Sequence, residues 1–62
     1  MRSQNVIKKI EAHGWCKVRQ TGSHTHFRHP DRPGTATVPH PKKHIPHGTL
    51  KSISRQTGVP LP

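Results

Sequence analysis

The sequence predicts an α+β fold in which a helix, three antiparallel strands and a second helix follow one another (α-β-β-β-α). Two amphipathic segments lie near the ends of the chain, and three short segments with alternating side chains lie between them. The connections between the strands are short, which favours a meander. Such a sheet needs one covered face, so we expect both helices on that face and an open face opposite.

The first helix is predicted over residues 4–13, with Ser3 as a candidate N-cap. Its apolar side chains share one stripe, formed by Val6, Ile7 and Ile10. Gly14 suits the position that follows a helix end. The second helix is predicted over residues 48–57, where Leu50 and Ile53 face the core. Gly58 ends it, and Pro60 and Pro62 indicate a frayed tail.

The first strand is predicted from Trp15 to Arg19, with Cys16 and Val18 inward and Lys17 and Arg19 outward. Cys16 is the only cysteine, which excludes an internal disulfide, and its neighbours favour a small buried residue over a reactive thiol. A turn over residues 20–23 follows. Residues 30–34 close a second hairpin, and the third strand is predicted over residues 35–38.

The second strand, residues 24–29, carries the most informative pattern. Side chains alternate between faces, so Thr25 and Phe27 point one way. Phe27 is the only phenylalanine, so its face is expected to be the core face. The opposite, open face then holds His24, His26 and Arg28. The residues that we expect in one core are Val6, Ile7, Ile10, Val18, Phe27, Val38, Leu50 and Ile53.

The charge is strongly one-sided. Eleven Lys and Arg residues face only Glu11 and Asp31, a formal charge of +9 on 62 residues. This balance points to a polyanionic partner, with nucleic acid favoured over an anionic membrane surface. No apolar run is long enough to span a bilayer, and the N-terminus lacks the apolar block of a signal peptide, so we expect a cytoplasmic protein.

Seven histidines in this chain allow three interpretations. The first is a metal site, but no cysteine pair or carboxylate accompanies His24 and His26, so we expect neither metal nor cofactor. The second is proton transfer on RNA. Imidazole can take the proton of a 2′-hydroxyl and protonate the leaving 5′-oxygen, while Lys or Arg stabilises charge on the phosphorane. The third is that these histidines are solvated, or bind phosphate only when protonated.

The loop over residues 39–46 is basic and has no periodicity. Its lysines and two cations of the second helix either are solvated or contact phosphate, and the scarcity of acids favours phosphate contact for part of the set. The cations concerned are Lys42, Lys43, Lys51 and Arg55.

Three segments together resemble the HicA-type toxins of bacterial and archaeal toxin–antitoxin pairs. They are Gly22-Ser23-His24 followed by His26-Phe27, then residues 38–43, Val-Pro-His-Pro-Lys-Lys, and residues 48–53, Gly-Thr-Leu-Lys-Ser-Ile. The opening from Ile7 to Trp15 also looks like that family, so the resemblance covers nearly all of one domain, residues 1–62. The chain departs from it at the proline-containing C-terminus and at His44, where many relatives carry an acid.

The resemblance implies an mRNA interferase with a fold like a double-stranded-RNA-binding domain. It implies that His24 is the catalytic histidine. It also implies an inhibitory HicB-like antitoxin that covers the active site and often binds DNA, so that DNA is contacted only indirectly. His26 is then either a second proton carrier or a phosphate contact. The residues expected to bind RNA are Lys17, Arg19, Ser23, Arg28, Lys42 and Lys43.

Three functions from different classes remain: a metal-independent ribonuclease toxin, a non-catalytic RNA-binding module with a basic sheet face, and a histidine-rich metal-binding protein. Degradation of mRNA by the purified protein in EDTA separates the first from the other two.

Overall fold

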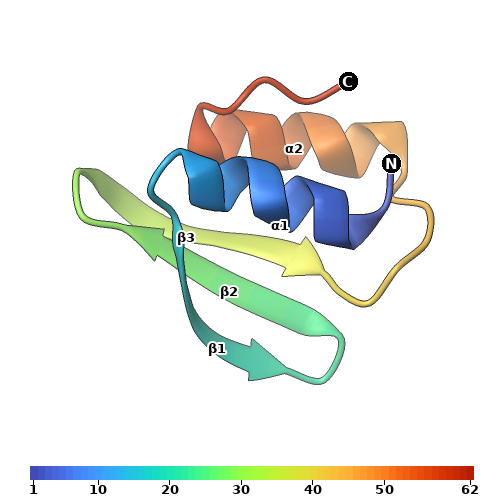
Figure 1. Ribbon diagram of the computed structural model, residues 1–62, viewed down its shortest axis with the longest axis horizontal. Helices are drawn as coiled ribbons and strands as arrows, with labels where there is room; N and C mark the ends of the chain where they lie inside the picture. Colours follow the sequence, from blue (N-terminus) through green and yellow to red (C-terminus); the bar gives the residue numbers. More distant parts are fainter.

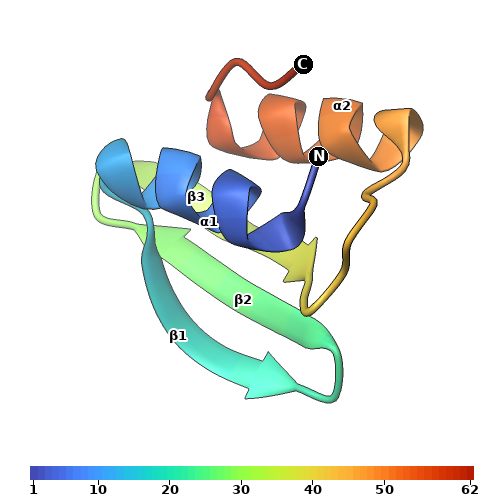
Figure 2. The same ribbon diagram turned by 45° about the vertical axis from the view of Figure 1, so that its right-hand side comes forward.

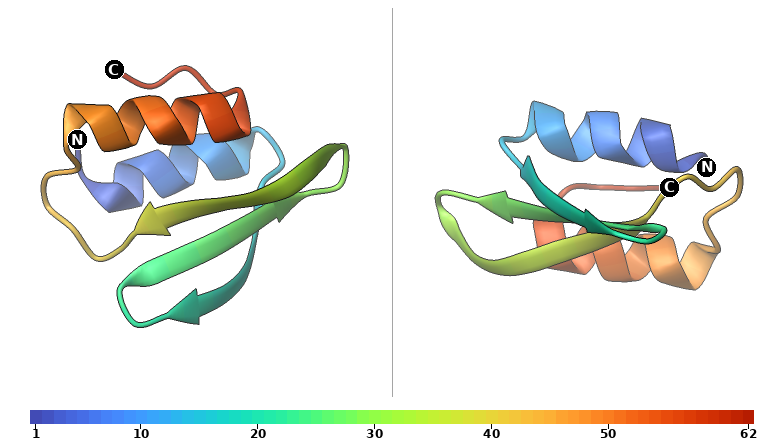
Figure 3. Two further views of the ribbon diagram at one scale, coloured as in Figure 1. Left: turned by 180° about the vertical axis from the view of Figure 1, so that it is seen from behind. Right: turned by 90° about the horizontal axis from the view of Figure 1, so that it is seen from below.

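The computed structural model describes residues 1–62 and has the α-β-β-β-α order that the sequence predicts. Its elements are α1 (Ser3–Ala12), β1 (Cys16–Thr21), β2 (His24–His29), β3 (Arg32–Pro39) and α2 (His47–Thr57). The three strands form one antiparallel sheet in the order β1-β2-β3. Both helices lie on the same side of this sheet (Figure 1). Seen from the opposite side, no element covers the strands (Figure 3, right). The predicted fold class is therefore confirmed.

The core lies between the helices and the β2–β3 half of the sheet. Its buried apolar residues are Val6, Ile10, Trp15, Phe27, Ala36, Val38, Ile45, Leu50, Ile53 and Val59. Six of the eight expected core residues are among them, and Ile7 packs against them while partly buried. Val18 is the exception, because 53% of its surface is exposed. Its expected inward placement is wrong.

A β-bulge explains why the alternation fails in β1. The pairing of β1 with β2 shifts between Lys17 and Arg19, which leaves Val18 without a cross-strand partner. An extra residue of this kind reverses which face the following side chains occupy. Lys17 pairs with Phe27 and so lies on the helix side of the sheet, whereas Cys16 pairs with Arg28 on the open side. Cys16 is exposed rather than buried, so both expected placements are corrected.

β1 also lies beyond the cover of the helices. It is the strand farthest from α1 and α2 in two views (Figures 1 and 2), and all six of its residues are exposed. The helices instead pack on β3. An edge strand outside the helical layer has no dry side, so its apolar residues gain nothing by pointing toward the helices.

The ends of the elements hold three further corrections. Arg2, not Ser3, is the N-cap of α1, and no side chain caps this end. β3 begins at Arg32, so the turn after β2 is shorter than expected. The C-terminal tail is not frayed throughout, because Val59 is buried and its carbonyl accepts a hydrogen bond from the Ser54 hydroxyl at 2.7 Å.

Two glycines end the helices as the sequence predicts. Gly14 has φ of 95° and Gly58 has φ of 72°, conformations in the left-handed region that favours glycine. A Cβ on Gly14 would lie 2.7 Å from Nε2 of His29, so the position is also sterically closed to larger residues.

Candidate functional site

The open face of β2 carries the residues that the sequence singled out. Thr25 and Phe27 are buried, so the alternating positions His24, His26 and Arg28 face away from the helices. His24 and Arg28 are exposed and His26 is half-buried. The expected division of this strand between a core face and an open face is therefore confirmed.

His26 is held in a row that crosses the sheet. Arg19 of β1 pairs with it on one side and Thr37 of β3 on the other. Its Nδ1 lies 3.1 Å from Oγ1 of Thr37. The hydrogen bond fixes the orientation of the ring and leaves Nε2 as the nitrogen available to a ligand.

His24 begins β2, directly after the turn that contains Gly22 and Ser23. Its cross-strand neighbours are Thr21 and Pro39. The ring is exposed and makes no hydrogen bond within the chain, so both nitrogens are available. Because a strand rises about 3.3 Å per residue, His24 and His26 lie about 7 Å apart along β2. That spacing brings both imidazoles within reach of one phosphodiester group.

The predicted RNA-binding cations divide into three places. Arg19 and Arg28 share the open face with the two histidines, while Lys17 lies on the other face. Lys42 and Lys43 are exposed in the loop between β3 and α2. That loop adjoins the β1–β2 turn, because the His40 amide donates to the Ser23 carbonyl at 2.7 Å. Ser23 itself is exposed.

Other histidines serve the fold instead. Nδ1 of His29 accepts a hydrogen bond from the Asp31 amide, and its Nε2 lies 2.8 Å from the His13 carbonyl. The same ring meets Trp15 edge-on, with ring centroids 5.3 Å apart. His29 thereby ties the β2–β3 hairpin to the end of α1. No group of three or more His, Cys, Asp or Glu side chains is arranged so that it could hold a metal ion.

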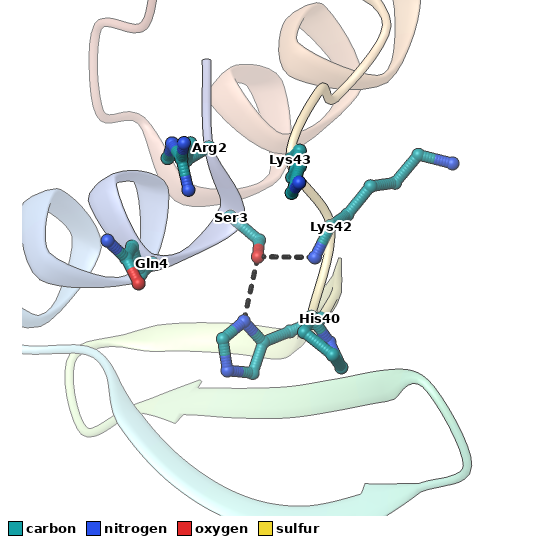
Figure 4. A pocket seen from close by; sticks show the side chains of 7 residues that line it. Arg2, Ser3, Gln4, His40, Lys42 and Lys43 are labelled. Carbon is teal, nitrogen blue, oxygen red and sulfur yellow. Dashed lines mark hydrogen bonds between the residues drawn. The ribbon is translucent and has the colours of Figure 1, made fainter.

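A depression lies at the start of α1, beside the loop between β3 and α2 (Figure 4). Ser3 is buried at its base, where its Oγ is 2.9 Å from the Lys42 amide nitrogen and 2.7 Å from Nδ1 of His40. Sequence reasoning assigned Ser3 to a helix cap and missed these contacts. No local pattern could reveal them, because the partners are 37 and 39 residues away.

Neither helix has the length and apolar character needed to cross a membrane.

The fold and this surface define a small, basic α-β-β-β-α protein with one exposed and one half-buried imidazole on an open sheet face. The family model described as "HicA toxin of bacterial toxin-antitoxin" matches residues 3–59. A solved structure described as "HicA3 and HicB3 toxin-antitoxin complex" is similar over all of both chains, with 30% identity and a TM-score of 0.79. No curated protein sequence matches.

The chain therefore belongs to the HicA toxin family and is a toxin of a toxin–antitoxin system. The family resemblance predicted from residues 22–27, 38–43 and 48–53 is confirmed.

Proposed function

We propose that this toxin is a metal-independent endoribonuclease that cleaves mRNA and thereby arrests translation and growth. The observation that carries the proposal is His24, an exposed imidazole with no partner in the chain, on an open face that it shares with Arg19 and Arg28. A structural histidine of the same chain, His29, is engaged at both ring nitrogens. Free ring nitrogens are what proton transfer to a bound substrate requires.

In the proposed reaction, His24 takes the proton of a ribose 2′-hydroxyl. The 2′-oxygen forms a bond to the neighbouring phosphorus, and the bond from phosphorus to the 5′-oxygen breaks. The leaving oxygen takes a proton, so the products are a 2′,3′-cyclic phosphate and a 5′-hydroxyl. The balance needs no metal and no oxidant or reductant.

His26 has two roles consistent with its setting. Its Nδ1 is engaged with Thr37, so Nε2 either supplies the proton for the leaving oxygen or contacts a phosphate oxygen. Arg19 pairs with His26, and its guanidinium would stabilise charge on the phosphorane. Arg28 and Ser23 flank the same face, and Lys42 and Lys43 extend the basic surface past its end.

The proposed inhibitor is an acidic HicB-like antitoxin that covers His24 and the open face. Two findings support it: the similar solved structure is described as a HicA3–HicB3 complex, and the chain carries a charge of +9. Opposite charge on the partner would make association fast and salt-dependent. Contact with DNA would arise only through the antitoxin. We expect the activity in the cytoplasm, where the proposed mRNA substrate is translated. Residues 1–62 would act as one domain.

The test is RNA cleavage in EDTA by the purified wild type, His24→Ala and the control His44→Ala. His44 is also exposed but lies in the loop before α2. We expect His24→Ala to lose cleavage and growth arrest while His44→Ala keeps both. Thermal melts should match the wild type, because an exposed imidazole without contacts contributes little stability. Antitoxin binding should stay nearly intact, because the substitution removes only one side chain of the covered face.

Full cleavage by a folded His24→Ala protein would remove the catalytic assignment. Absence of cleavage in the wild type, with RNA binding retained, would favour the non-catalytic RNA-binding module. Activity lost in EDTA and restored by zinc or magnesium would contradict metal independence.

A further inference from the structure

We propose that the depression at the start of α1 binds a backbone phosphate of the RNA, at a position next to the phosphate that is cleaved. The assignment rests on the proposed ribonuclease function. It adds a second position for the substrate, which lies just past the end of β3. Seven residues line the depression: Arg2, Ser3, Gln4, His40, Pro41, Lys42 and Lys43.

The lining suits an anion. Three of its members are cationic, none is acidic and none is hydrophobic. In Figure 4, Arg2 and Lys43 stand on either side of Ser3, whereas the Lys42 side chain extends away from it. The cavity measures about 230 Å³. Since a water occupies about 30 Å³, this volume accommodates a phosphate group with part of its hydration shell.

Backbone groups add to the positive character. The Gln4 amide belongs to the first turn of α1 and donates no hydrogen bond within the chain. That turn contains no acidic residue, and the Arg2 side chain makes no capping bond. Of the amides in the first turn, that of Gln4 is thus left for an outside acceptor, and a phosphate oxygen can fill that role.

Two reciprocal hydrogen bonds between Ser3 of α1 and Lys42 of the loop hold the base of the depression. The Ser3 amide donates to the Lys42 carbonyl at 2.9 Å, and the Lys42 amide donates to Oγ of Ser3 at 2.9 Å. The same Oγ lies 2.7 Å from Nδ1 of His40 and forms a second hydrogen bond with that ring. A buried serine therefore joins α1 to the loop and fixes the spacing of the cations.

The depression lies close to His24 in the fold. Pro39 is the cross-strand partner of His24, and His40 is the next residue. The His40 amide bonds the carbonyl of Ser23, the residue before His24. Neighbouring Cα atoms are about 3.8 Å apart, so the depression begins one residue past the partner of His24. An RNA strand that passes His24 can follow the end of the sheet into it.

RNA fits this lining better than the antitoxin does. The residues that dominate protein interfaces are Trp, Tyr and Arg, and this depression contains Arg2 but neither Trp nor Tyr. Three cations together with the free Gln4 amide match a phosphodiester.

The experiment measures binding of a single-stranded RNA with 2′-O-methyl groups, which this mechanism cannot cleave. The double variant Arg2→Ala/Lys43→Ala is compared with Lys8→Ala/Lys9→Ala. All four side chains are exposed and both variants lose two charges, but Lys8 and Lys9 lie outside the depression. We expect roughly fivefold weaker binding for the first variant, less than twofold for the second, and a salt dependence shallower by about 0.7 for the first alone.

The same RNA with a 5′-hydroxyl or a 5′-phosphate distinguishes the source of the phosphate. An equal loss with both supports an internal phosphodiester, and a loss only with the 5′-phosphate overturns that assignment. Equal weakening by both double variants would show a general charge effect and overturn the site. So would an Arg2→Ala/Lys43→Ala variant that binds RNA normally but loses antitoxin. Cleavage by His24 is read in a separate assay, so the two proposals fail independently.

Discussion

β1 and β2 are neighbouring strands of six residues with similar alternating sequences, yet only β2 has a buried side. In β2, Thr25 and Phe27 are 1% and 0% exposed. In β1 every residue is exposed, and a bulge interrupts the pairing at Val18. β2 is the central strand and its inner side is buried, whereas β1 is an edge strand beyond the helices. Alternation of polar and apolar residues along a strand therefore predicts which side chains are buried only where other elements cover the sheet and the strand register is unbroken.

The difference also separates stability from function. The core face of β2 holds the sheet to the helices, and its other face is free to carry polar chemistry. β1 contributes a row of side chains to that open face, such as Arg19 beside His26, without contributing to the core. The following substitutions test this division through the free energy of unfolding, measured by urea or thermal denaturation.

Phe27→Ala should give the largest effect. It removes a fully buried ring at the centre of the core, and such truncations cost about 3–5 kcal/mol. A chain of this size has a total stability of only about 3–9 kcal/mol. We expect the variant to be largely unfolded by circular dichroism. A melt within a few degrees of the wild type would contradict the placement of Phe27 in the core.

Trp15→Phe tests how β1 is anchored. Trp15 is buried just before β1, and its Nε1 donates to the Thr57 carbonyl at 3.3 Å. Phenylalanine keeps an aromatic ring but leaves that buried carbonyl without its donor, at a cost of about 1–3 kcal/mol. Loss of stability without loss of the folded baseline is the expected result. An unchanged midpoint would mean that β1 is held by its pairing with β2 alone.

Thr25→Val should act in the opposite direction. The Thr25 hydroxyl is buried and has no hydrogen-bond partner. Valine has nearly the same shape and removes the unpaired polar atom, so we expect a gain of about 1 kcal/mol. Thr25→Ser is the matched control, because it keeps the hydroxyl and removes the methyl group. Destabilisation by valine would show that the hydroxyl is satisfied in solution.

Val18→Ala should have the smallest effect, within about 0.5 kcal/mol of the wild type, because an exposed side chain has little burial to lose. The same truncation at Val38, which is buried on β3, serves as the comparison and should cost more. Equal losses at the two positions would restore Val18 to the core and remove the contrast between the strands.

Burial could be predicted from the sequence where it depends on spacing within one element, but not where it depends on contacts between distant segments. Phe27, Val38 and the helix stripes were predictable, because their spacing matches the element that buries them. Ile45 and Val59 were not, since each lies next to a proline in a segment without helical or strand periodicity. Their burial depends on how the loop and the tail fold back. The inward assignment of Val18 failed because a bulge has no reliable local signature.

The candidate site shows the same limit. The shared face of His24, His26 and Arg28 was predictable from one strand alone. Lys17 was misplaced because its face depends on the bulge. The link from Ser3 to His40 and Lys42 was invisible, because it joins positions that meet only when the fold is complete.

The free edge of β1 has a consequence for how the toxin behaves at high concentration. A strand that ends a sheet offers unpaired amides and carbonyls to another chain, and sheets can grow into fibres in this way. Here the bulge disrupts a flat edge. Two copies that paired along β1 would also bring the positive charges of Lys17 and Arg19 close to the same charges of the second copy. Both features disfavour edge-to-edge polymerisation. We therefore expect the free toxin to stay monomeric in solution, with the edge of β1 available only to a partner that supplies opposite charge.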